Sequence, residues 1–239
     1  MKEILKRNSV YLGLCLALLV ALGIVLLIYP KPDIHLWLNQ FHRPVLDVFF
    51  RHYTIVAEWI PYVIAVALLF YKAGWSAFFA ACVALSGLVG QAVKHLVDAP
   101  RPLTYFARNF PDIHLQLVEG VRMNRVYSFP SGHTLTFFAM FFALSIILTD
   151  YLANKNAQTT NHKPQIVPVL WQILFFILAV AGAYSRIYLS QHFAFDIWGG
   201  IVVGMTVSML LCLLLPLVKD QKWFNWHFFA KKTQKNLVD

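Results

Sequence analysis

Six apolar runs, each long enough to cross a lipid bilayer, constrain this chain more than any other feature of its sequence. They lie at about residues 9–29, 53–71, 76–97, 132–149, 167–185 and 192–218. A helix needs roughly 20 apolar residues to cross the hydrocarbon layer, and only helices or closed barrels satisfy the backbone there. The runs predict an all-α integral membrane bundle of six transmembrane helices, with no room for a separate soluble domain.

The composition agrees with a membrane protein. Hydrophobic residues make up 59% of the chain and charged residues 13%, against about 45–50% and about 25% in soluble domains. The net charge of +9 does not indicate nucleic-acid binding, because the basic residues are scattered over loops without a basic helix or aromatic platform. Anionic lipid headgroups are the favoured partners, and the sequence indicates no obligate protein partner.

Neither the three cysteines nor the first apolar run indicates a reactive or cleaved site. Cys15, Cys82 and Cys212 each lie within an apolar run, where a thiol packs among helices, so they predict neither a disulfide framework nor a metal site. The first run follows basic residues as a signal peptide does, but no small-x-small cleavage site comes after it. We therefore expect a retained helix at 9–29.

The chain is expected to form one membrane-embedded domain over residues 1–239, with its core at about 53–215. Residues 33–52 mix aromatic and charged side chains and predict a helix lying in the outer interface, with a plain loop as the alternative. The aromatic and basic tail at 219–239 is expected to anchor at the inner interface. Residues 103–131 form the longest predicted loop, because Pro100 and Pro102 interrupt the preceding helix.

The distribution of lysine and arginine predicts the orientation. If the N-terminus is cytoplasmic, eleven of the 20 basic residues face the cytoplasm and nine face the other side. Three of those nine belong to the polar cluster described next, which leaves six. We therefore expect both termini to be cytoplasmic.

Eight residues from three separate segments are predicted to meet at the outer ends of the spans. The segments contribute Lys94 and Arg101, then Ser131, Gly132 and His133, then Arg186, His192 and Asp196. Ionisable groups beside apolar spans are costly, so such a cluster indicates a functional site. A single lysine or arginine there is more often a side chain that extends to the interface.

These residue types suit phosphoryl transfer. His192 and Asp196 are spaced i,i+4, which on a helix places the carboxylate beside one ring nitrogen and leaves the other free for attack. His133 is then available to protonate a leaving alkoxide. The three cations provide the field that a transferring phosphoryl group needs, and backbone N–H groups near Ser131 and Gly132 add to the anion site.

A metal-based alternative fits the sequence less well. The other outer acids are dispersed singly, at Asp33, Asp47, Glu58, Asp98, Asp112 and Glu119, whereas magnesium and two-metal sites need convergent carboxylates. Zinc held by the two histidines and Asp196 stays open as an alternative. We predict no cofactor and no metal.

The three segments resemble the signature of the type 2 phosphatidic acid phosphatase (PAP2) family, to which glucose-6-phosphatase and the vanadium haloperoxidases also belong. That signature is Lys, six residues, Arg-Pro; Pro-Ser-Gly-His; and Ser-Arg, five residues, His, three residues, Asp. Here it is filled by Lys94 to Pro102, Pro130 to His133 and Ser185 to Asp196.

The resemblance implies a role for each of these residues. His192 is expected to form a phosphohistidine, Asp196 to orient it, and His133 to act as general acid. Lys94, Arg101, Arg186, Ser131 and Gly132 are expected to bind phosphate.

The resemblance also implies a bacterial inner-membrane enzyme whose site faces the periplasm. Its expected substrate is undecaprenyl diphosphate, phosphatidylglycerophosphate, phosphatidic acid or a lipid A phosphate. The motifs read only the phosphate and do not choose among these lipids. A glucose-6-phosphatase-like soluble substrate and a non-catalytic lipid-phosphate binder are the alternatives; six spans disfavour a haloperoxidase, because those relatives are soluble.

Overall fold

Helix α8 (Gly132–Ala157) forms the centre of the molecule in this computed structural model, which describes residues 2–157 and 166–228. It packs most extensively against α6 (Ala73–Val97), α9 (Ile166–Tyr188) and α10 (Ala194–Val218). In its most apolar stretch 67% of the residues are buried, against 11% to 33% in the other long helices. Helix α8 contributes four buried phenylalanines to the core, Phe137, Phe138, Phe141 and Phe142.

The prediction of an all-α bundle with six spans is confirmed. Helices α2 (Ser9–Ile28), α6, α8, α9 and α10 are each long and apolar enough to cross a membrane. Helices α4 (Pro44–Tyr53) and α5 (Val56–Tyr71), which are bent by 43° where they join, pass the same test only as a pair and make the sixth span when the pair is counted as one. The described residues contain no β-strand.

Residues 33–52 form two helices rather than the single one expected. Helix α3 (Lys31–Asn39) ends before an irregular stretch, and Pro44 begins α4, because proline is favoured in the first helical turn, where its missing N–H is not needed. Both helices contact α9. Their location in a membrane interface stays a prediction.

The long connection after α6 also contains an unexpected helix. Helix α6 ends at Val97, Asp98 adopts a left-handed conformation with φ of 40°, and Pro100 prevents a continuous helix. Pro102 then begins a short helix, α7 (Pro102–Asn109), inside the segment that we expected to be a loop. Residues 110–131 are irregular, and α8 begins at Gly132 as predicted.

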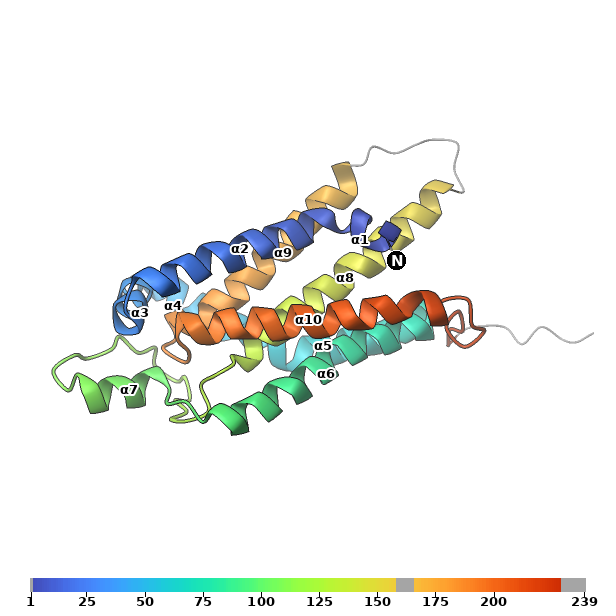
Figure 1. Ribbon diagram of the computed structural model, residues 1–239. Coiled ribbons are helices and arrows are strands. Elements are labelled where there is room, and N and C mark those ends of the chain that lie inside the picture. Colours follow the sequence, from blue (N-terminus) through green and yellow to red (C-terminus); the bar gives the residue numbers. More distant parts are fainter. Residues whose placement is uncertain (1, 158–165, 229–239) are drawn as a thin grey trace, which may run out of the picture.

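The two ends of the bundle are built differently. Figure 1 shows α3, α4, α7 and the turn between α9 and α10 gathered at one end, while α1 (Lys2–Arg7) and the end of α10 lie at the other. Both ends of the described chain are therefore on the same side of the bundle, as an even number of spans requires. Which compartment that side faces stays a prediction.

The described part of the C-terminal tail only partly fits a simple anchor. Trp223 and Trp226 are exposed, as an interfacial anchor requires, but Phe224 is buried against α6. A Cβ atom on Gly74 would lie 2.1 Å from the Phe224 ring, so the absence of a side chain at Gly74 makes room for it. Residues 229–239 lie outside the described part of the chain.

Helix α10 approaches α8 closely at the two glycines that are spaced four residues apart. A Cβ atom on Gly200 would lie 2.9 Å from the Ser131 carbonyl oxygen, and one on Gly204 would lie 2.6 Å from the Leu135 carbonyl oxygen. Real Cβ atoms essentially never come so near to backbone. Small residues spaced four apart allow two helices to approach this closely.

Candidate active site

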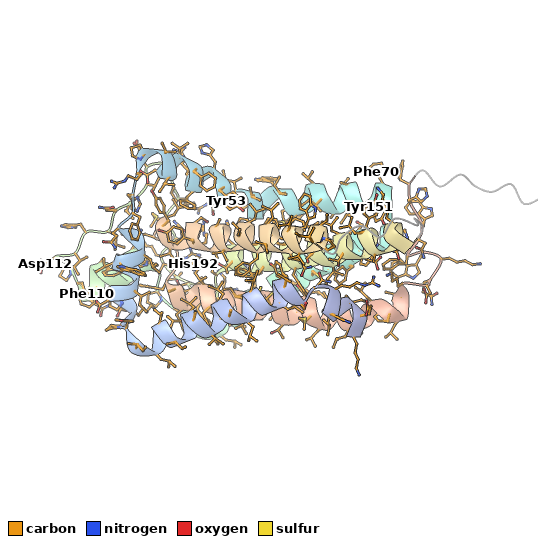
Figure 2. The ribbon with its side chains drawn as sticks, turned by 90° about the horizontal axis from the view of Figure 1, so that it is seen from above. Tyr53, Phe70, Phe110, Asp112, Tyr151 and His192 are labelled. Carbon is orange, nitrogen blue, oxygen red and sulfur yellow. The ribbon has the colours of Figure 1, made fainter. Side chains whose placement is uncertain are left out.

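The three sequence motifs come together at the end of the bundle that carries α3, α4 and α7. Figure 2 shows His192 toward the same end as Phe110 and Asp112, whereas Phe70 and Tyr151 lie at the opposite end. Six of the eight predicted residues are buried, and the other two, Gly132 and His133, are partly exposed at the beginning of α8.

His192 and Asp196 are paired, but not on one face of a helix as the i,i+4 spacing suggested. His192 precedes α10, and Asp196 is its third residue. The Nδ1 atom of His192 lies 3.5 Å from Oδ2 of Asp196. The same Oδ2 accepts hydrogen bonds from the Phe193 N–H at 2.8 Å and from the Ser128 hydroxyl at 2.5 Å. Asp196 thus caps α10 and orients His192 with one oxygen.

The turn before α10 fixes the His192 backbone to the end of α9. The His192 N–H donates to the Arg186 carbonyl oxygen at 3.1 Å, and the Gln191 N–H donates to the same oxygen at 2.9 Å. Burial lowers the pKa of the His192 imidazole to about 3, while the hydrogen bond with Asp196 opposes this shift and Arg101 adds to it. The imidazole is therefore neutral at pH 7 and keeps a lone pair on Nε2.

Ser131 directly precedes α8 and joins the start of this helix to the start of α10. Its hydroxyl accepts from the Thr134 N–H at 3.4 Å, as a helix N-cap does. Its own N–H donates to the Asp196 carbonyl oxygen at 2.9 Å. A Cβ atom on Gly132 would lie 3.9 Å from Nζ of Lys94, so the lysine ammonium lies beside the backbone of this helix start. The arrangement suits an anion.

The guanidinium groups are held by backbone and side-chain oxygens. Arg101 donates to the carbonyl oxygens of Val126 at 3.0 Å and Gln191 at 3.3 Å, and to the Gln191 side chain at 3.1 Å. Arg186 donates to the Thr54 hydroxyl, and its Nε has no partner among the described residues. A buried, unpaired N–H of this kind is costly unless an anion binds it.

His133 faces the site from the first turn of α8. Its Nε2 atom lies 3.1 Å from Oε1 of Glu58, in the first turn of α5. The charges of Arg186, Lys94 and Arg101 lie close enough to act on this imidazole, as does His192. All eight residues predicted from the motifs therefore belong to one cluster.

Four further residues of the cluster were not predicted from the sequence. Ser128, Thr54, Gln191 and Glu58 contact Asp196, Arg186, Arg101 and His133, respectively. Gln191 directly precedes His192, and this neighbouring position in the sequence could have identified it as a site residue. Ser128 and Thr54 carry no such signal, because their contacts depend on the path of the chain after α6 and on the bend between α4 and α5.

Helix α3 covers the site with two further titratable residues. The Lys31 ammonium lies 3.8 Å from the centre of the Phe193 ring, and burial lowers the pKa of this lysine while Asp196 raises it. His35 pairs its Nε2 with the Ser190 hydroxyl at 3.3 Å, and burial lowers the pKa of His35 to about 4. Within the described residues no three His, Cys, Asp or Glu side chains are grouped so as to hold a metal ion.

Comparison with known proteins agrees with this site. The model of the PAP2 superfamily matches residues 75–220, a range that includes all three motifs. A lipid A 4'-phosphatase of Porphyromonas gingivalis is 28% identical over 186 residues, which cover 74% of this chain and 69% of that protein.

Two crystal structures share the fold. That of LpxE from Aquifex aeolicus superposes with a TM-score of 0.59 at 20% identity, over 78% of this chain and 97% of that one. That of a transmembrane PAP2-type phosphatidylglycerolphosphate phosphatase from Bacillus subtilis superposes with a TM-score of 0.62 at 18% identity, over 93% of this chain and 100% of that one. The family match, spanning more than half of the chain, and the assembled motifs together show that this chain belongs to the PAP2 superfamily and is a phosphatase acting on lipid phosphates.

Proposed function

We propose that this protein releases phosphate from a membrane lipid through a phosphohistidine at His192, without a metal ion. The observation that carries this proposal is the buried, neutral His192 imidazole, whose Nδ1 faces Asp196 while three cations surround the same space. A neutral imidazole is a nucleophile, and fixed cations stabilise the charge of a transferring phosphoryl group.

The first step forms the phosphoenzyme. Nε2 of His192 attacks the phosphorus atom, the bond from phosphorus to the lipid oxygen breaks, and His133 gives a proton to the departing oxygen. Asp196 stabilises the positive charge that develops on the His192 ring. Lys94, Arg101 and Arg186, with the N–H groups at the start of α8, hold the equatorial oxygens.

The second step releases phosphate. A water molecule attacks the phosphorus atom, the bond to Nε2 of His192 breaks, and the proton of the water passes to His133. Inorganic phosphate leaves, and His133 again carries the proton needed for the next lipid. The two imidazoles thus have different tasks, and only His192 forms a covalent bond.

We propose as substrates the lipid A phosphates, undecaprenyl diphosphate, phosphatidylglycerophosphate and phosphatidic acid. The name of the Porphyromonas gingivalis relative supports lipid A as the first lipid to test. We further propose that the enzyme resides in the bacterial inner membrane with both termini cytoplasmic and its site facing the periplasm. The shared side of both described ends and the excess of basic residues there support this orientation.

One experiment tests the reaction. Purified protein is incubated with each of these lipids in EDTA, and phosphate release is compared between the wild type and His192→Ala. We expect the wild type to retain its activity in the chelator and the variant to release no phosphate. Acid-labile, base-stable labelling of the wild type with a ³²P-labelled substrate would identify phosphohistidine.

The outcomes separate the proposal from its alternatives. Loss of wild-type activity in EDTA, restored by zinc, would replace the proposed mechanism with a metal-dependent one. A folded wild type that binds these lipids but cleaves none of them would be a non-catalytic binding protein. Wild-type rates in His192→Ala would refute the assignment of the nucleophile.

A further inference from the structure

Glu58 contributes a carboxylate to the site although it lies outside all three motifs. It occupies the first turn of α5, and its Oε1 atom lies 3.1 Å from Nε2 of His133. The Glu58 side chain is 53% exposed and that of His133 is 23% exposed. The Glu58–His133 pair therefore lies at the edge of the site, with His133 on the less exposed side and Glu58 on the more exposed side.

The charges around His133 explain why a carboxylate matters there. Arg186 on α9, Lys94 on α6 and Arg101 before α7 all act on the imidazole, and so does His192 before α10. His133 therefore lies among three positively charged side chains, which a neighbouring carboxylate can balance. Asp196, the other carboxylate of the cluster, faces Ser128, Phe193 and His192 rather than His133. Glu58 is thus the carboxylate in contact with His133.

The bend between α4 and α5 places this carboxylate. Thr54, at the bend, accepts a hydrogen bond from Arg186, and Glu58, four residues later in the first turn of α5, contacts His133. The charge of Glu58 also acts on Arg186. One short segment therefore supports both a phosphate-binding arginine and the acid histidine.

We propose that Glu58 is a positioning residue that keeps His133 oriented and protonated for proton donation to the leaving group. This inference rests on the proposed function, because it concerns the acid of that reaction. The Glu58 carboxylate stabilises the His133 imidazolium before it gives its proton to the lipid oxygen. After that step, the same carboxylate favours the return of a proton to His133. Since the Glu58 side chain is 53% exposed, it is open to proton exchange with the surroundings of the site.

The test compares Glu58→Gln with the wild type on two substrates. The glutamine keeps the size and a hydrogen-bonding group but loses the charge. For a lipid phosphate, whose alkoxide needs a proton, we expect kcat/KM to fall roughly 10- to 100-fold, within the range that general acid catalysis contributes. For p-nitrophenyl phosphate, whose leaving group needs no proton, we expect kcat/KM to stay within about threefold.

The pH profile supplies a second readout. If Glu58 maintains the proton on His133, the alkaline limb of the lipid phosphate profile moves to lower pH in Glu58→Gln. Asp112→Asn is the matched control, because it also removes one acidic charge and Asp112 is exposed in the loop after α7. The control should keep both the rates and the pH profile of the wild type.

The results distinguish this inference from the proposed function. An inactive wild type would overturn the proposed function itself. An active wild type with unchanged rates in Glu58→Gln would overturn only the role of Glu58. Equal losses on both substrates, together with a lower Tm and an unshifted profile, would mean that Glu58 merely supports the fold, and would also overturn the inference.

Discussion

Substitution of Gly204 by alanine tests whether close contact between α8 and α10 sets the geometry of the site. The new Cβ would lie 2.6 Å from the Leu135 carbonyl oxygen. An ordinary contact needs at least 3.4 Å, so the helices must separate by about 0.8 Å. The obstacle is backbone of a buried helix, which has no alternative rotamer. Overpacking of this kind costs about 1–3 kcal/mol in the free energy of unfolding.

The same separation should reduce turnover. Gly204 lies on α10 about two turns after Asp196, so a shift of α10 moves Asp196 and His192 away from Ser131 and His133 on α8. A misplacement of about 1 Å can cost roughly 100-fold in rate. We therefore expect Gly204→Ala to lower both the Tm in detergent and kcat for a lipid phosphate, with the loss in kcat reaching up to about 100-fold.

The control is Gly87→Ala on α6, where the added Cβ meets no atom within 4 Å beyond its chain neighbours and the adjacent backbone of its own helix. Alanine is favoured over glycine in a helix by up to about 1 kcal/mol, so this variant should be at least as stable as the wild type and fully active. Thermal unfolding and phosphate release are measured for both variants. Wild-type Tm and kcat in Gly204→Ala would refute the argument from close packing.

Three further predictions concern the catalytic pair. Asp196→Asn should lower kcat by roughly 10² to 10⁴ while leaving measurable phosphate release, because His192 remains but loses its orienting charge; an unchanged rate would remove that role from Asp196. Ser128→Ala should lower the free energy of unfolding by about 1.5–3 kcal/mol, measured by thermal unfolding, because a hydrogen bond to the buried Asp196 carboxylate is lost. It should reduce kcat less than Asp196→Asn does, since the Phe193 N–H still holds the carboxylate. The third prediction concerns pH. The pKa of the His192 imidazole is about 3 in the folded protein and about 6.5 in the unfolded chain, so protonation of His192 favours the unfolded state. The stability it contributes is present above pH 6.5 and is lost as the pH falls toward 3, by about 2 kcal/mol at pH 5; the wild type should therefore lose more Tm between pH 7 and pH 5 than His192→Asn, and equal losses would contradict the shifted pKa.

The spans and the motif residues could be predicted because their signals are local. A run of about 20 apolar residues needs no partner to be recognised, and the motif positions are fixed by spacing. The pairing of His192 with Asp196 was predicted for a partly wrong reason, since His192 lies before α10 and the contact arises from the helix cap. The i,i+4 spacing still led to the correct pair, because the cap at the start of α10 also brings residues four apart into contact.

Other features depended on tertiary structure. Glu58 was interpreted as a dispersed outer acid, because nothing in the sequence indicates that the bend between α4 and α5 directs it toward His133. The burial of Phe224 likewise depends on Gly74, about 150 residues earlier in the chain. Contacts of this kind follow from how helices pack, which periodicity and composition do not specify.

The position of the connection between α8 and α9 has a practical consequence. Ala157 and Ile166 end and begin their helices at the opposite end of the bundle from His192 (Figures 1 and 2). His133, the proposed general acid, lies before this connection, and His192 and Asp196, the proposed nucleophile and its carboxylate, lie after it. A protein produced as two polypeptides divided there would carry one imidazole on each, so phosphate release would report whether two membrane fragments had found each other.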